Sequence, residues 1–186
     1  MKISRQTRRF TAARPARIFA ALTVSLSLMS VLLTPARGSN VLGHTAGGNS
    51  TVVFNQDTLT DRIHDAFHFV IDRSIEPTDI TADLWHDPDA VKEVNINDAD
   101  YGETSWYGKW TCIEWASPTV CDKGRVKINL YYGPYSDTEA RSLVCEEVGH
   151  AVGLAHRPST APSRMSQQWH ETKLDDHDKN HLNALY

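Results

Sequence analysis

Apolar residues recur at helical spacing in two stretches of the chain. In residues 59–74 they fall every three or four positions, which predicts a helix that packs one face against a sheet. A second helix is expected from Ser136 to about Gly153, because Ser136 and Glu139 have the form of a capping box at its start. Its apolar positions are Ala140, Val144, Val148, Ala151 and Val152. We expect these side chains to be buried, which leaves the opposite face of the helix for polar chemistry.

Shorter stretches that are rich in β-branched and aromatic residues predict strands. They are residues 51–55, 80–85, 91–96, 104–113 and 126–132. Near the end of the sequence, Asp175 is in place to cap a short helix over residues 176–185. The pattern therefore predicts both strands and helices, with two of the helices after the last strand.

Residues 1–38 have the layout of a secretory signal peptide. Seven basic residues and no acidic residue precede Asp57, and an apolar run covers residues 18–33. This run is too short for a comfortable transmembrane helix and ends in small residues, which favours cleavage after Ala36 or Gly38 over an uncleaved anchor. We therefore expect a secreted, extracellular protein.

After the signal peptide the sequence predicts one folded domain. Removing residues 1–38 from the 186-residue chain leaves 148 residues, enough for a single core. Residues 39–50 lack periodicity and predict a flexible mature N-terminus, so the domain is expected at residues 51–186. Without the seven basic residues of the signal, 12 Lys and Arg remain against 23 Asp and Glu, a formal charge of −11. This acidity argues against nucleic acid as a partner and against stable association with an anionic membrane.

The three cysteines suggest one local disulfide, which an exported protein can form. Cys112 and Cys121 bracket a short loop at residues 113–120, so a bridge between them is expected. Cys145 is left over. On the second helix it falls beside Val152 on the packed side, so we expect a buried small side chain there rather than a metal ligand.

The second helix also carries a group of residues with the spacing of a metal site. At about 100° per residue, Glu146 and His150 lie on one helical face, close enough to bind a single ion. Glu147 is the next residue round the helix. Gly153 can take the left-handed conformation that ends a helix, so His156 can return toward the same point from outside it.

This stretch resembles the metzincin signature, H-E-x-x-H-x-x-G-x-x-H, which is followed by the methionine of the Met-turn. Glu147, His150, Gly153 and His156 match the signature, and Met165 lies nine residues after His156. The residue before Glu147 is a glutamate where the family has its first histidine ligand. The resemblance is to the secreted, actinobacterial, matrixin-like type of metzincin.

The resemblance implies a zinc endopeptidase that hydrolyses extended peptide or protein substrates, and we expect it to be a monomer. Glu146, His150 and His156 would hold the zinc, Glu147 would act as the general base, and Met165 would form an apolar floor beneath the ligands. The implied fold is α+β, with a twisted mixed β-sheet, a backing helix, an active-site helix, the Met-turn and a C-terminal helix.

Two further features are implied by the resemblance. In metzincins the strand above the active-site helix is an edge that pairs with substrate, and residues 101–107 are the candidate for it. A cysteine at position 145 would pair with a cysteine just before the Met-turn methionine. Arg164 is at that position in this chain, so Cys145 is expected to be unpaired.

The carboxylate at position 146 leaves three hypotheses open. Two histidines and a carboxylate suffice in thermolysin-like zinc sites. Replacing an imidazole lowers the net charge of the metal site from +2 to +1, however, and so weakens the metal as a Lewis acid. The protein is then an active zinc endopeptidase or a pseudoprotease that keeps the metzincin scaffold as a binding module. A secreted structural domain with a chance match to the motif is the third hypothesis.

Two other pairs of histidines are also spaced four residues apart. His64 and His68 lie at the edge of the apolar stripe of the first helix. His177 and His181 lie on the terminal helix, and no third ligand follows them in the sequence. We interpret the first pair as boundary histidines and the second as part of a solvated helix face.

Overall fold

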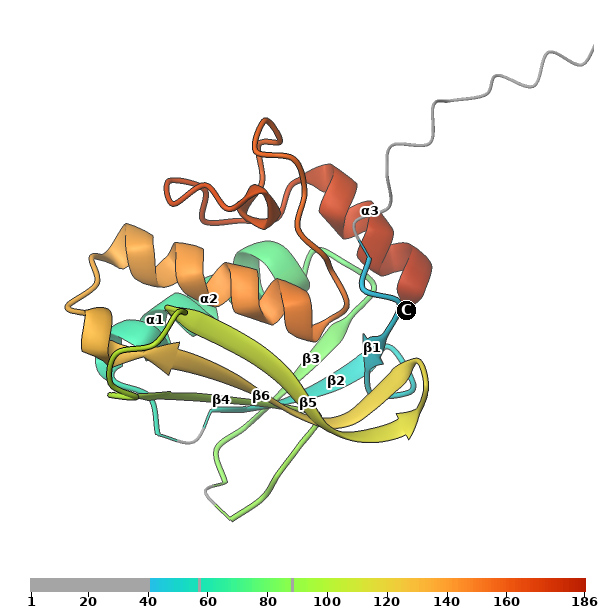
Figure 1. The fold of residues 1–186 in the computed structure, drawn as a ribbon. Coiled ribbons are helices and arrows are strands. Elements are labelled where there is room, and N and C mark those ends of the chain that lie inside the picture. The colour runs from blue at the N-terminus through green and yellow to red at the C-terminus, as the bar shows by residue number, and fades with distance from the viewer. Residues whose placement is uncertain (1–40, 57, 88) are drawn as a thin grey trace, which may run out of the picture. The chain divides into compact units, whose positions relative to one another are not determined.

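The computed structural model describes residues 41–56, 58–87 and 89–186. Its sheet contains β1 (Thr45–Ala46), β2 (Thr51–Gln56), β3 (Thr81–Trp85), β4 (Val94–Ala99), β5 (Gly108–Ser117) and β6 (Val120–Asn129). The α-helices are α1 (Asp61–Val70), α2 (Asp137–Ala151) and α3 (Asp176–Leu185). Short helical segments are η1 (Ile71–Ile75), η2 (Leu130–Tyr132) and η3 (Arg164–Ser166). Figure 1 shows the three α-helices on one face of the sheet.

The sheet is mixed, as the resemblance stated above implies. Five strands pair in parallel in the order β1-β6-β4-β2-β3, and β5 runs antiparallel to β6. In the described part of the chain β5 pairs with β6 alone, so its other edge has no strand partner. Because β5 also packs against α2, this free edge lies next to the helix that carries the predicted site.

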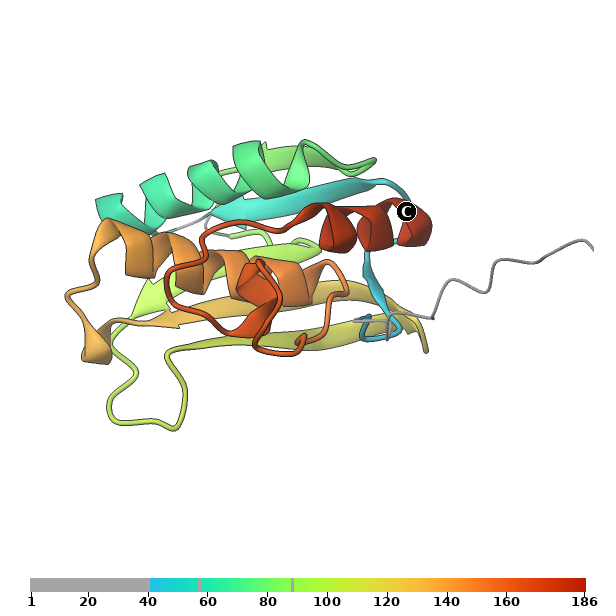
Figure 2. The ribbon, with the colours of Figure 1, turned by 90° about the horizontal axis from the view of Figure 1, so that it is seen from above.

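The core lies between the sheet and the helices α1 and α2, which run side by side (Figure 2). Phe54 and Ile128 from the sheet and Phe67 from α1 are fully buried there. The five apolar side chains predicted to be buried on the second helix, four on α2 and one at its C-cap, are buried: Ala140, Val144, Val148, Ala151 and Val152. Their burial fixes the rotation of α2 about its axis, so the face with Glu146 and His150 is turned away from the core.

The β5–β6 hairpin differs from the sequence prediction in its limits. A loop is predicted at residues 113–120, but the two strands continue through most of it and turn at residues 118–119. The predicted disulfide between Cys112 and Cys121 is confirmed, with Cα atoms 5.8 Å apart. Aromatic and β-branched residues occur on both faces of this hairpin, so their pattern does not mark where either strand ends.

Residues 41–50 pack on the domain, although the sequence predicts a flexible N-terminus there. β1 pairs with β6, and Ala46 is fully buried. The N–H of Leu42 donates to the carbonyl oxygen of Gly153 at 2.7 Å, and the N–H of Ala46 donates to the Tyr186 hydroxyl at 2.9 Å. The predicted boundary at residue 51 is therefore wrong, because a two-residue parallel pairing leaves no periodic pattern in a sequence.

The predicted signal peptide, residues 1–38, and residues 39 and 40 lie outside the described part of the chain. The signal and its cleavage site therefore stay predictions. Among the helices that are described, none has both the length and the apolar character needed to cross a bilayer.

Candidate metal centre

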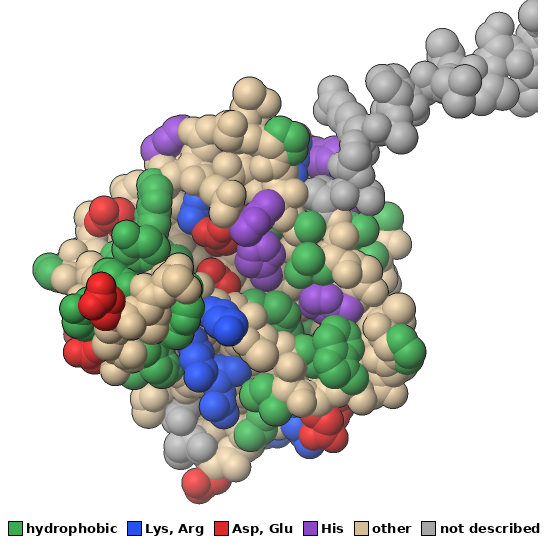
Figure 3. All heavy atoms as spheres, viewed as in Figure 1, with side chains coloured by type: hydrophobic (Ala, Val, Ile, Leu, Met, Phe, Trp, Pro, Cys, Tyr) green, Lys and Arg blue, Asp and Glu red, His purple; other side chains and the backbone are tan. Residues whose placement is uncertain are grey.

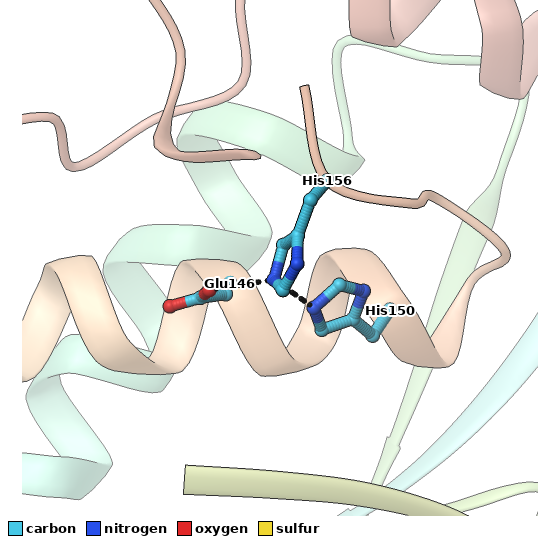
Figure 4. A group of neighbouring side chains, drawn as sticks. All are labelled: Glu146, His150 and His156. Atoms are coloured by element: carbon cyan, nitrogen blue, oxygen red, sulfur yellow. Dashed lines mark hydrogen bonds and ion pairs between the residues drawn. The ribbon is translucent and has the colours of Figure 1, made fainter. Parts of the chain in front are cut away.

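Helix α2 presents two of the predicted ligands on one face. Its start is fixed by the predicted capping box, in which Ser136 Oγ accepts the N–H of Glu139 and the Glu139 carboxylate accepts the N–H of Ser136 at 2.8 Å. Glu146 and His150 are one helical turn apart near the other end of α2. Figure 4 shows that both side chains project from the same side of this helix.

The third predicted ligand, His156, comes from the loop after α2. Gly153 ends the helix with a φ of +104°, a conformation that glycine adopts without strain. A Cβ at this position would lie 2.2 Å from the carbonyl oxygen of His44, so any other residue would force the backbone to shift. Further along, the N–H of Arg157 donates to the carbonyl oxygen of Met165 at 2.7 Å. These contacts turn the chain back and hold His156 over α2.

Three ligand atoms converge at this point. Nε2 of His156 lies 2.9 Å from Nε2 of His150 and 2.9 Å from Oε1 of Glu146 (Figure 4). All three atoms lie within 4.8 Å of one another, and no other group of three such ligands is found in the described residues. Ligands about 2.1 Å from a tetrahedral zinc would lie about 3.4 Å apart. Small side-chain rotations are therefore enough to fit the ion.

The positions of the protons also favour a cation at the centre of this group. His150 Nδ1 lies 2.7 Å from the carbonyl oxygen of Leu154, so Nδ1 carries the ring proton and Nε2 has a free lone pair. Burial lowers the pKa of His150, which keeps the ring neutral. Nε2 of His156 can carry at most one proton, and one proton makes one strong hydrogen bond, either to His150 or to Glu146. The other contact is then left without a donated proton, whereas a cation would satisfy all three atoms.

Glu147 lies between this group and strand β5, and it is 6% exposed. A Cβ at Gly108 would lie 2.6 Å from Glu147 Cγ, so the strand passes directly against the side chain. Burial, and to a lesser extent the charge of Glu146, raises the pKa of Glu147 to about 8, while a hydrogen bond from the backbone of Trp110 opposes this. A carboxyl group with a pKa near neutrality is suited to accept and return a proton.

Met165 is fully buried in η3, directly against α2. A Cβ at Gly149 would lie 2.6 Å from Met165 Sδ, so this close packing requires glycine in the helix. Gly149 lies between the two ligand-bearing turns of α2. The methionine therefore forms an apolar contact under the segment that carries Glu146 and His150.

Arg164 belongs to the site, although the sequence alone did not indicate this. Its side chain is 3% exposed, and Nη2 forms an ion pair with Oε2 of Glu146. Its Nε donates to the carbonyl oxygen of Ser142 at 2.8 Å, and the guanidinium lies 5.2 Å from the ring of Trp169. One signal was present in the sequence. Glu146 replaces the first histidine of the signature, and Arg164 is at a position where the resemblance implies a cysteine. Two residues that contact each other can differ from a family pattern together.

A second ionic group ties the loop that carries the third ligand to α3. Nη1 of Arg157 lies 2.7 Å from Asp175 and 3.3 Å from Asp178. Asp178 is fully buried and accepts a hydrogen bond from Ser163 Oγ. The prediction of a solvated helix face is therefore wrong for Asp178, which faces the Met165 turn.

A cleft of about 710 Å³ runs along β5 and over the three ligand atoms. Its lining includes residues 105–110, Leu143, Glu147, Arg164, Gln167 and Trp169. In Figure 3, histidine and acidic side chains meet in a hollow of the surface, with Lys and Arg side chains beside them. The cleft thus joins the candidate metal centre to the free edge of β5.

The predicted position of the edge strand, residues 101–107, is wrong. This segment is a loop that is held by Asn129, whose Oδ1 accepts the N–H of Tyr101 and whose Nδ2 donates to the carbonyl oxygen of Gly102. The edge strand begins at Gly108. The loop brings Tyr107 against Trp169, with ring centroids 5.4 Å apart, at one end of the cleft.

The remaining candidates stay apart from this cluster. The rings of His64 and His68 contact each other on α1, and those of His177 and His181 on α3, each pair tilted and with ring centroids 4.4 Å apart. In the part of the chain that is described, neither pair completes a group of three metal ligands. Cys145 is buried and outside any disulfide, as expected, and burial raises its pKa to about 12.

Comparison with known proteins adds little to this geometry. No family model matches the chain, and no curated protein matches it. A solved structure of myroilysin is similar at 16% identity with a TM-score of 0.44, covering 62% of this chain and 54% of that one. A second myroilysin structure is similar at 16% identity with a TM-score of 0.41, covering 64% and 53%. The chain thus spans about half the length of the structures it matches, and a likeness of this extent carries no inference about activity.

Proposed function

We propose that this protein is a zinc-dependent endopeptidase of the metzincin type. The observation that carries the proposal is the convergence of Glu146 Oε1, His150 Nε2 and His156 Nε2 on one point. Two histidines and one carboxylate are the protein ligands of known catalytic zinc sites. The cleft beside them is also lined by three consecutive residues of β5, Gly108, Lys109 and Trp110.

Zinc in this position would supply a Lewis acid that polarises a peptide carbonyl and activates water. Glu147 would take up a proton at its carboxyl group and return it to the leaving amine. Burial raises the pKa of this carboxyl group, which suits it both to accept a proton and to return it. The hydrogen bond from Trp110 would hold the Glu147 carboxyl in place beside the cleft.

The substrate would be an extended peptide or protein segment. β5 has one edge without a strand partner in the described residues, and an extended peptide could add to this edge through backbone hydrogen bonds. Such pairing depends little on side chains, so it would align many different sequences along α2. Secretion, the other part of the proposal, is supported by the basic and apolar N-terminal sequence and by the Cys112–Cys121 disulfide, which suits an oxidising compartment.

The test combines metal content with cleavage. The purified protein, dialysed against metal-free buffer and reloaded, should hold one zinc per chain and cleave casein or an unstructured peptide. A chelator should abolish cleavage, and added zinc should restore it. Glu147→Gln should keep the zinc but lose at least about a thousandfold in kcat, because the base is gone while the ligands remain.

Glu103→Gln is the matched control, since Glu103 is exposed and should not affect either measurement. Binding of zinc without any cleavage would refute the proposed endopeptidase activity and favour a pseudoprotease that acts as a binding module. Absence of zinc binding would refute the proposed metal centre, and with it both the endopeptidase and the zinc-binding module.

A further inference from the structure

The two carboxylate oxygens of Glu146 have different partners. Oε2 is ion-paired with Arg164 Nη2, whereas Oε1 faces Nε2 of His156 at 2.9 Å. Arg164 is itself fixed, because its Nε donates to the carbonyl oxygen of Ser142 in the same helix as Glu146. The guanidinium thus determines which oxygen of Glu146 is turned toward the histidines.

The ion pair also changes the charge of the candidate centre. A carboxylate adds one negative charge to the ligand set, and a guanidinium in contact with it adds one positive charge. Together Glu146 and Arg164 are formally neutral, as an imidazole is. Both side chains are largely buried, at 10% and 3% exposure, so solvent screens these charges little.

We propose that Glu146 and Arg164 act as one neutral ligand unit, in which Arg164 is a positioning residue that orients Glu146 Oε1 toward the metal and compensates its charge. The proposal rests on the metal centre proposed above. It means that the carboxylate at position 146 does not weaken the metal as its charge alone would. It also means that Glu146→His alone would not give a better site, because it would leave a buried guanidinium unpaired beside a divalent cation.

Four proteins test this coupling: the natural chain, Glu146→His, Arg164→Met and the double variant. Thermal unfolding is measured in excess chelator, and the zinc dissociation constant is measured by competition with a chromophoric chelator. Without metal, each single variant should melt roughly 10 °C lower than the natural chain, because one buried charge loses its partner. The double variant should regain most of this loss.

With metal, the double variant should bind zinc on the order of a hundredfold more tightly than Glu146→His, because it lacks the unpaired positive charge. Arg164→Lys should recover part of the melting temperature lost in Arg164→Met, since it keeps the charge but not the bond to Ser142. If Glu146→His does not fold, recovery of a cooperative transition in the double variant shows the same coupling.

Equal zinc affinities for Glu146→His and the double variant would overturn the proposal and leave only a structural ion pair. Additive changes in melting temperature would overturn it as well. The proposed endopeptidase function would still hold after either result if the natural chain binds zinc and cleaves peptide. Zinc binding by the double variant but not by the natural chain would instead refute the proposed function and retain the coupling between the two positions.

Discussion

Glu147→Gln should change the pH dependence of stability in a defined direction. Glu147 is 6% exposed, and the pKa of its carboxyl group is raised from 4.5 to about 8 in the folded protein. The folded state therefore keeps a proton that the unfolded state releases above about pH 4.5. Between these two values the unfolded state binds fewer protons, so the free energy of unfolding falls as pH rises.

The size of this effect follows from the same two pKa values. At 1.36 kcal/mol per pH unit, burial of Glu147 would destabilise the metal-free protein by at most about 5 kcal/mol above pH 8. Glutamine has the same shape and no charge to bury. Glu147→Gln should thus match the natural chain at pH 4 and be more stable by a few kcal/mol at pH 8.5.

Urea unfolding in the presence of a chelator, followed by tryptophan fluorescence at pH 4, 6 and 8.5, measures this difference. The same comparison with Glu103→Gln controls for a general charge effect, since Glu103 is exposed. A stability difference between Glu147→Gln and the natural chain that is the same at all three pH values would refute the reasoning. A difference that grows as pH falls would refute its sign.

Two further predictions concern the surroundings of the site. Gly153→Ala should lower the free energy of unfolding by about 2–4 kcal/mol, because its φ is +104° and a Cβ would meet the His44 carbonyl oxygen. Gly102→Ala, with positive φ but open space around it, should lose only about 1 kcal/mol by the same thermal or urea unfolding. Cys145, fully buried with a pKa raised to about 12, should not react with a thiol reagent at pH 8 until the protein is unfolded, and rapid reaction of the folded protein would contradict its burial.

Local signals in the sequence were enough to predict much of the site. The capping box at Ser136 and Glu139 and the apolar stripe of α2 together define its start and its buried face. Helical periodicity then places Glu146 and His150 on the other face. The glycine at position 153 marks the turn by which His156 returns, because few other residues adopt that conformation.

Contacts between distant segments were not predictable in this way. Arg164 pairs with a residue 18 positions earlier, and arginine side chains are exposed in most proteins. Asp178 likewise occupies a polar stretch of α3 and is buried only because Arg157 and Ser163 reach it. The sequence offers no periodic pattern for such pairs. These pairs form only in the folded protein, where the segment after α2 turns back over the helix.

The packing of residues 41–46 determines where a shortened protein can safely begin. A truncated chain that starts at residue 51 would lose β1 and the hydrogen bond from Leu42 to Gly153. That bond anchors the residue at which the chain reverses before His156. Deletion of these N-terminal residues would therefore loosen the loop that carries His156. Weak metal binding by such a fragment would then result from the loss of β1 and not from the chemistry of the ligands.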